Sequence, residues 1–302
     1  MRSLCYAVKH AFYVSVISTV VVLALGWCVQ AQVSFNFTSF DYPGATSTSA
    51  FGINEAGIIV GTYVDSSAVN HGFGRLPNAT FEKLDYPGAT GTFLYRVNDL
   101  NQAVGYYLDG TGLAHGFLFT SPNHFTAINF PAASQTKAFG INNGGQIVGT
   151  WYDSNGNTTG FSLQNGTYTT IVYPGATSTI VSDVNTAGVM SGNWGNNGVP
   201  NSQSHGFLLT SLNGTFTDVD FPGAAKTLVF GINDFNQVVG DYTDSNNALH
   251  GWGGVPASHE FITIDFPGAT ACQVDGLTNK GNLSGQYTDS TNKTHGFLAV
   301  PK

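Results

Sequence analysis

Phe216-Thr-Asp-Val-Asp-Phe-Pro-Gly223 is the stretch that decides the fold, because a close variant of it occurs six times along the chain. The other five copies each begin at an aromatic residue: Phe37, Phe81, Phe125, Tyr168 and Phe261. The prolines that end successive copies are 44, 44, 43, 48 and 45 residues apart. A period of this length indicates one supersecondary unit repeated along the chain.

The composition is that of a folded β-protein. Of the 302 residues, 9% are charged, 13% are aromatic and 38 are Gly. A disordered chain would be poor in aromatic residues and rich in charge, whereas this balance favours short strands joined by tight turns. The formal net charge is −8 and no cluster of Lys or Arg occurs, so nucleic acid and anionic membrane surfaces are excluded as partners.

The N-terminus has the pattern of an export signal. An apolar run, Ala11–Trp27, follows basic residues, and Val29–Ala31 offers small residues where a signal peptidase would cut. We predict a signal peptide over 1–31 and a secreted or cell-surface protein with no membrane insertion once the leader is cleaved. The alternative is a leader that is kept as an anchor. Cleavage leaves Cys272 as the single cysteine, so no internal disulfide is expected.

Each repeat predicts four short strands. In the fifth copy these begin at Lys226, Val238, His250 and Phe261, with no helical periodicity between them. In two copies an Asn-Gly pair, at Asn165 and at Asn213, separates the last two strands, which is typical of a hairpin. Four strands in one period match one blade of a β-propeller.

The two ends of the chain predict how the repeats close. The chain opens on a fourth strand, Phe35–Tyr42, with no first three before it, and ends on a third strand, Thr294–Val300, with no fourth after it. We therefore predict an all-β, six-bladed propeller in which the N-terminal strand completes the last blade and removes the exposed edges. The predicted blades are 45–87, 88–131, 132–174, 175–222, 223–267, and 268–302 together with 34–43. An open solenoid of β-repeats is the alternative.

The segment Asn142-Asn-Gly-Gly-Gln-Ile-Val-Gly149, followed in most copies by His-Gly-Phe, resembles the bacterial extracellular HAF repeat. That pattern runs Gly-Ile-Asn-x-x-Gly-x-Val-Gly and then His-Ala-Phe, and the resemblance covers the whole chain after the leader. The chain departs from it by having Gly in place of Ala at Gly72, Gly116, Gly206, Gly251 and Gly296. The resemblance implies export and a repeat fold, and it implies no defined reaction.

Two residue types recur in the turns of the repeats. The histidines are His71, His115, His205, His250 and His295, and the aspartates are Asp65, Asp109, Asp153, Asp244 and Asp289. We interpret them as structural, with a carboxylate beside an imidazole fixing the turn, as in WD-type blades. One His per blade does not supply the converging ligands of a metal site, and the loop at Asp153 lacks the Gly and Glu of a calcium loop. We predict no metal and no cofactor.

A Gly and an aromatic residue share one face of the second strand in every copy. The aromatic residues are Tyr63, Tyr107, Trp151, Trp194, Tyr242 and Tyr287. We predict inter-blade packing, in which each ring lies over the space beside its Gly. A ring of sugar-stacking platforms is the alternative, and it requires exposed faces.

A functional site is expected where the copies differ, since positions common to all copies serve the repeat's own packing. Arg96 and Asp183 replace the Gly that most copies have before the Ile/Val-Asn step. First strands line the channel of a propeller, so we expect both charges at its mouth, with Tyr106, Asp241 and the loop aromatic Trp194 as further ligand-binding candidates. Drift on a solvated face explains the same variety.

The sequence favours a non-catalytic, exported, monomeric binding module that presents variable rim loops to an extracellular ligand, either a glycan or a protein. It contains no Gly-x-Ser-x-Gly elbow, His-Glu-x-x-His motif or phosphate-binding loop, so no catalytic residue is assigned. Two alternatives stay open. One is a secreted polysaccharide hydrolase or lyase that uses carboxylates across the channel. The other is a structural component of a cell-surface matrix.

Overall fold

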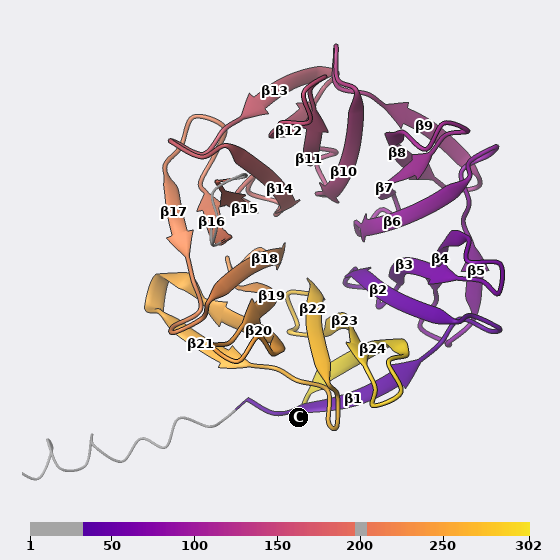
Figure 1. Ribbon diagram of the computed structural model, residues 1–302, viewed down its shortest axis with the longest axis vertical. Helices are drawn as coiled ribbons and strands as arrows, with labels where there is room; N and C mark the ends of the chain where they lie inside the picture. The colour runs from indigo at the N-terminus through magenta and orange to yellow at the C-terminus, as the bar shows by residue number, and fades with distance from the viewer. Residues whose placement is uncertain (1–32, 197–203) are drawn as a thin grey trace, which may run out of the picture. The chain divides into compact units, whose positions relative to one another are not determined.

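The chain forms a ring of six four-stranded antiparallel sheets (Figure 1). The computed structural model describes residues 33–196 and 204–302, so the predicted signal peptide lies outside the described residues. Asn36–Pro301 is one compact unit. No helix in the described part of the chain is long and apolar enough to cross a membrane.

The strands follow one another with almost no other regular structure between them. They are β1 (Phe35–Phe40), β2 (Ser47–Ile53), β3 (Ile59–Val64), β4 (Asn70–Arg75), β5 (Phe81–Lys83), β6 (Gly91–Val97), β7 (Ala103–Leu108), β8 (Ala114–Thr120), β9 (His124–Ile128), β10 (Gln135–Ile141), β11 (Ile147–Tyr152), β12 (Thr158–Gln164), β13 (Thr167–Ile171), β14 (Ser178–Val184), β15 (Met190–Gly195), β16 (His205–Leu209), β17 (Phe216–Val219), β18 (Lys226–Ile232), β19 (Val238–Thr243), β20 (Leu249–Val255), β21 (Glu260–Thr263), β22 (Ala271–Leu277), β23 (Leu283–Thr288) and β24 (Thr294–Pro301). One 3₁₀ turn, η1 (Pro256–Ser258), precedes β21.

The first strand of every sheet lies innermost and the last lies on the outside of the ring (Figure 1). The innermost strands are β2, β6, β10, β14, β18 and β22. In all six sheets the pairing of the first and second strands is interrupted by a β-bulge. Such a bulge leaves one residue of the first strand unpaired and re-aims its side chain.

The last sheet joins the two ends of the described chain. Its strand order is β1-β24-β23-β22, so the N-terminal strand supplies the fourth strand that the last repeat lacks. Across this seam, Phe37 packs edge-on against Phe266 and Phe297 at 5.4 and 5.5 Å between ring centroids. Lys293 Nζ lies 2.6 Å from Asp41 Oδ2. The predicted six-bladed propeller, closed by its N-terminal strand, is confirmed.

The interior of each blade is built around one large aromatic residue of the third strand. These are the fully buried Phe73, Phe117, Phe161, Phe207, Trp252 and Phe297. The Gly of the second strand leaves room for that ring: a Cβ on Gly61 would lie 2.9 Å from Phe73 and 2.1 Å from the carbonyl oxygen of Ser49. The predicted role of this Gly is therefore corrected, because third-strand aromatic atoms and first-strand backbone fill the space, and the second-strand aromatic does not.

The second-strand aromatics instead stack between blades. Each lies flat against the aromatic residue that precedes Pro in the neighbouring sheet, with ring planes within 8° of parallel. The pairs are Tyr42–Tyr63, Tyr86–Tyr107, Phe130–Trp151, Tyr173–Trp194, Phe221–Tyr242 and Phe266–Tyr287. The inter-blade packing role is confirmed, and rings used in this way are not open sugar platforms.

Four of the five repeated histidines contact their own blade at two points. His71 Nε2 lies 3.3 Å from the turn carboxylate of Asp65, as predicted, and its Nδ1 lies 2.8 Å from Asp85 just before the Pro-Gly turn. Three other pairs show the predicted turn contact: His115–Asp109, His250–Asp244 and His295–Asp289, at 3.0, 3.8 and 3.3 Å. The second partner was missed from the sequence, and it is Asn129, Asp265 and Asp41 in these three blades.

In two copies of the repeat, one of the residues that make these contacts is replaced. The third copy has Thr159 in place of His, and there Asp153 Oδ1 accepts hydrogen bonds from the N–H groups of Asn155 and Asn157 at 2.7 and 2.9 Å. This is the predicted Asx turn. In the fourth copy, which lacks the turn aspartate, His205 keeps its contact with Asp220 at 2.9 Å.

The Gly of the His-Gly step is required by close backbone approach. A Cβ on Gly251 would lie 2.4 Å from the carbonyl oxygen of Ile264 and 2.8 Å from Val274. We expect Gly251→Ala to lower the free energy of unfolding by ~1–3 kcal/mol, the usual cost of overpacking a core. The matched control is Gly110→Ala, where a Cβ meets nothing within 4 Å and the change should stay within ~0.5 kcal/mol. Urea unfolding of both variants measures the two free-energy changes. Equal losses in the two variants would contradict the close packing at Gly251.

Two turn carboxylates make the stability of the fold sensitive to acid. Hydrogen bonds from the Thr111 hydroxyl, from His115 and from backbone N–H groups lower the pKa of Asp109, and the Thr291 hydroxyl and neighbouring N–H groups do the same for Asp289. Their stabilisation is present above the unfolded value of ~3.9 and is lost as the pH falls towards the lower folded values. The double variant Asp109→Asn/Asp289→Asn should therefore show a shallower fall in melting temperature from pH 5 to pH 2.5. An unchanged slope would contradict this assignment.

Candidate functional site

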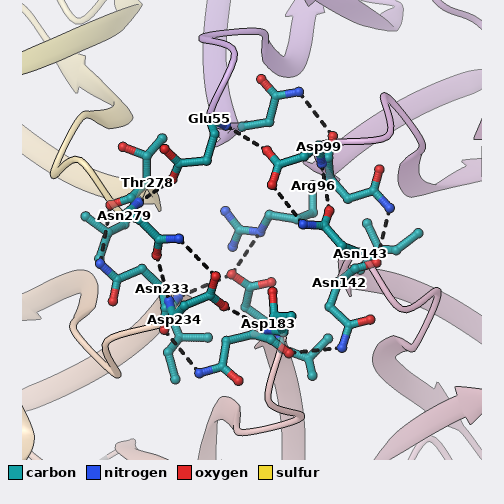
Figure 2. Close-up of a pocket in the computed structure, with 18 of the residues that line it drawn as sticks. Glu55, Arg96, Asp99, Asn142, Asn143, Asp183, Asn233, Asp234, Thr278 and Asn279 are labelled. Carbon is teal, nitrogen blue, oxygen red and sulfur yellow. Dashed lines mark hydrogen bonds and ion pairs between the residues drawn. The ribbon is translucent and has the colours of Figure 1, made fainter.

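The central channel has three successive parts, each made by the innermost strands and the turns that follow them. The mouth is a ring of polar turn residues, below it lies a buried ion pair, and beyond the pair lies a cavity. Figure 2 shows the mouth with the ion pair at its centre.

A chain of asparagines lines the mouth. Asn54 Oδ1 accepts the N–H of Ile58 in its own turn, and its Nδ2 donates to the carbonyl oxygen of Asn98 in the next blade, at 2.9 and 3.1 Å. The same inter-blade bond continues around the ring as Asn98 to Asn142, Asn142 to Asn185, Asn185 to Asn233 and Asn233 to Thr278. The mouth is therefore held by bonds that link each turn to the next.

The acidic side chains of the mouth are already used by neighbouring turns. Asp99 Oδ1 accepts the N–H of Glu55 and Asp234 Oδ1 accepts the N–H of Thr186, both at 2.9 Å, and the Glu55 carboxylate accepts the N–H of Asn279. Among the described residues, no group of three or more His, Cys, Asp or Glu side chains could hold a metal ion. The acidic side chains of the mouth therefore link neighbouring turns.

Arg96 and Asp183 form an ion pair below the mouth (Figure 2). Arg96 Nε lies 3.2 Å from Asp183 Oδ2, and the residues are 8% and 5% exposed. The Nε–H does not have hydrogen-bond alignment towards Asp183, so the contact is electrostatic. Burial raises the pKa of Asp183, and the positive charge of Arg96 opposes that shift.

The Arg96 guanidinium also ties together carbonyl oxygens from several blades. Its terminal nitrogens donate to the carbonyl oxygens of Phe230, Asp275 and Phe51, at 2.8, 3.0 and 3.3 Å. One side chain of β6 therefore bonds to β2, β18 and β22 and pairs with β14. Both residues line the channel mouth, as predicted, but they are paired with each other and are therefore not open charges for a ligand.

The cavity beyond the ion pair has a volume of about 390 Å³. All six residues that the first-strand bulges leave unpaired line it, namely Phe51, Tyr95, Phe139, Ser182, Phe230 and Asp275. Further polar lining comes from Asn193, Gln273 and Gln286. The bulge is thus the device that turns one side chain of every blade into the cavity.

Asp275 is the chemically unusual member of this ring. It is 6% exposed, and its Oδ2 has no hydrogen-bond partner among the described residues. Burial raises the pKa of Asp275 well above its usual value, and the nearby Asp241 carboxylate adds to the shift while Arg96 opposes it. A raised pKa favours the protonated form of this carboxyl, in which it can donate a hydrogen bond.

Trp194 lines the cavity from β15, a strand and not the loop that was predicted. Its indole stacks with Tyr173 at 4.3 Å and with His205 at 4.6 Å, and its Nε1 donates to Asp218 at 3.1 Å. The indole faces are thus engaged by the protein, and the aromatic faces offered to a ligand come from the bulge residues.

Tyr106 and Asp241 do not line the cavity. Tyr106 stacks on Phe93 at 4.6 Å, and Lys137 Nζ lies 4.8 Å from the centre of its ring. Asp241 is 2% exposed and accepts a hydrogen bond of 2.5 Å from Gln273. Of the predicted ligand-binding residues, then, Arg96 and Trp194 line the cavity, Asp183 lines the mouth above it, and Tyr106 and Asp241 stand behind the walls.

Two residues of the polar wall, Asp275 and Gln273, were not predicted from the sequence. A usable signal was present, because the position before the Gly of the Ile/Val-Asn step is aromatic in four copies, whereas it is Ser182 in the fourth copy and Asp275 in the sixth. Cys272, the one cysteine among the described residues, is structural: its Sγ accepts the N–H of Phe266, where other blades use a Thr hydroxyl, and burial raises the pKa of its thiol to about 12.

Fold and site define a closed six-bladed β-propeller with a cavity in its central channel. No family model matches the chain, and no curated protein sequence matches it. Among solved structures, AofleA of Arthrobotrys oligospora is similar with a TM-score of 0.58 at 13% identity, over 89% of this chain and 88% of that one. The Aleuria aurantia lectin bound to Fucα1-6GlcNAc has a TM-score of 0.54 at 11% identity, over 84% and 91%. TolB of Acinetobacter baumannii gives 0.53 at 10% identity, over 86% and 64%. Identities this low show a shared fold alone.

Breaking the channel ion pair should be costly. We expect Asp183→Ala to lower the free energy of unfolding by ~3–5 kcal/mol, because it leaves the buried Arg96 charge without its partner. The double variant Arg96→Met/Asp183→Ala should lose less stability than the sum of the losses measured for Arg96→Met alone and for Asp183→Ala alone. Lys280→Ala at the mouth, where the lysine side chain is 69% exposed, is the control and should change stability by under ~0.5 kcal/mol. If the losses in free energy of unfolding measured with denaturant are additive, Arg96 and Asp183 do not stabilise each other, which would contradict the ion pair.

Proposed function

We propose that this protein is an exported, non-catalytic β-propeller that binds a neutral carbohydrate in its central-channel cavity. The observation that carries the proposal is the lining of the cavity, where aromatic bulge residues are combined with amide, hydroxyl and carboxyl groups around about 390 Å³. Small-molecule sites commonly have this size range and this mixture of apolar walls with a few placed polar groups. A sugar matches it, because a pyranose has apolar C–H faces and hydroxyls at its edges.

The charges of the cavity favour a neutral ligand. The Arg96 guanidinium is occupied by Asp183 and by three carbonyl oxygens, and burial raises the pKa of Asp275, which favours its uncharged form. A charged ligand would lose its hydration without gaining a free opposite charge in return. Hydroxyl groups lose less on burial and find amide partners here.

The structural neighbours support a glycan before a protein ligand. The Aleuria aurantia lectin carries Fucα1-6GlcNAc on a propeller that covers most of this chain. The cavity is also lined by strands of the ring and lies in the channel, which suits a monosaccharide or the end of a glycan chain better than a folded protein surface. A fucoside therefore belongs in the first set of ligands to be tested.

The setting of the protein is part of the same proposal. The leader pattern over 1–31 favours export, and the Gly-Ile-Asn and His-Gly-Phe steps favour an HAF-type repeat protein that acts as a monomer outside the cell. Analytical ultracentrifugation of the chain from Gln32 onwards, and N-terminal sequencing of the exported form, test these points directly.

Glycan binding by the chain from Gln32 onwards is tested on a glycan array, with affinities then measured by calorimetry. We expect Phe139→Ala, which removes one cavity face, to weaken binding about 2- to 10-fold, since an aromatic contact contributes ~0.5–1.5 kcal/mol beyond its buried area. The matched control is Phe235→Ala, a phenylalanine that is 67% exposed and outside the cavity, and it should leave binding unchanged.

Two outcomes would overturn the proposal. Absence of binding to any glycan, or equal losses in the two phenylalanine variants, would remove the cavity as the site. Turnover of the bound glycan in a broad glycosidase and lyase assay would favour the enzyme alternative.

A further inference from the structure

One wall of the cavity contains three side chains joined by hydrogen bonds. Gln286 Nε2, on β23, donates to Gln273 Oε1, on β22, at 2.5 Å. Gln273 Nε2 in turn donates to Asp241 Oδ2, on β19, at 2.5 Å. Gln273 and Gln286 line the cavity, whereas Asp241 lies behind them. A buried carboxylate is therefore connected to the cavity through two amides.

The carboxylate at one end fixes the direction of the whole chain. An ionised carboxylate only accepts hydrogen bonds, so Gln273 has to turn its NH₂ group towards Asp241 and its oxygen towards Gln286. Gln286 then has to use its own NH₂ group on Gln273. No described residue donates to Gln286 Oε1, so this oxygen remains available to a ligand.

We infer that Asp241 is the positioning residue of the cavity, because its carboxylate sets both amides so that the wall presents Gln286 Oε1 as an acceptor in addition to the Asp275 carboxyl as a donor. This inference rests on the proposed function and makes it more specific. It defines the ligand as neutral and as carrying a hydrogen-bond donor and an acceptor close together, as neighbouring hydroxyls of a sugar do. Asp241 itself does not touch the ligand.

The surroundings of Asp241 make its charge state variable. The charged or titratable groups near it are Lys226 on β18 and Asp275 on β22, and its neighbour on β20 is Gly251. Burial raises the pKa of Asp241 to about 6, and the Gln273 hydrogen bond and Lys226 oppose the shift. A protonated carboxyl both donates and accepts, so below that pH the direction of the amides is no longer imposed.

The ligand-free protein tests the relay by NMR of the side-chain amide groups. At pH 8 we expect Asp241→Asn to shift the NH₂ signals of both Gln273 and Gln286, although Gln286 does not contact residue 241. Glu82→Gln, the same carboxyl-to-amide change on exposed β5, is the control and should shift neither. A shift confined to Gln273, or no shift in either signal, would overturn the inference.

The unmodified protein gives a second measurement that does not depend on a variant's folding. As the pH falls from 8 to 5, both amide signals should move together with a midpoint near 6, the value to which burial raises the pKa of Asp241. Gln286 signals that stay still while those of Gln273 move would show that the relay does not reach the cavity.

Binding of neutral methyl glycosides, methyl α-L-fucoside among them, separates this inference from the proposed function. If the relay is seen and wild-type protein binds none of them, the proposed function fails and the relay stands. If wild-type protein binds one, we expect Asp241→Asn to weaken it about 3- to 10-fold, the value of one hydrogen bond. Equal affinity in wild type and variant would overturn the positioning role.

Discussion

The pairing of β1 with β24 is the constraint on which the rest of the structure depends. It completes the sixth sheet with a strand from the other end of the chain, so no sheet edge is left open at the seam. Only a closed ring brings six first strands around one axis. The Arg96 bonds show this dependence plainly, because one guanidinium on β6 reaches carbonyl oxygens on β22 of the seam sheet and on β2 and β18 of the two sheets beside it.

Within that ring, repeated positions build the scaffold and altered positions build the cavity. The inter-blade stacks hold neighbouring sheets together, while the buried third-strand aromatics and the histidine contacts hold the strands and turns within a blade. The bulge residues differ between the copies. Four of them are aromatic and form the apolar walls of the cavity, while Ser182 and Asp275 form polar ones. One backbone irregularity, repeated six times, thus produces an apolar cavity with a polar side.

The repeat period and the unmatched terminal strands were sufficient to predict the fold, because both reflect local chain geometry. The His–Asp turn link was predicted for the same reason, since its partners are six residues apart. Contacts between distant blades could not be read in this way. Arg96 and Asp183 were recognised as exceptions, yet nothing local shows that they face each other across the channel. Likewise, Asp241 and Gln273 belong to different repeats, so the buried relay became visible only in three dimensions.

The central claim is that the channel cavity is the ligand site, and a crystal structure of the protein soaked with a neutral methyl glycoside tests it most directly. We expect sugar density inside the channel, against the aromatic bulge residues and within hydrogen-bond distance of Gln286 Oε1 and the Asp275 carboxyl. Density confined to the outer surface between blades, with the channel occupied by water alone, would contradict it.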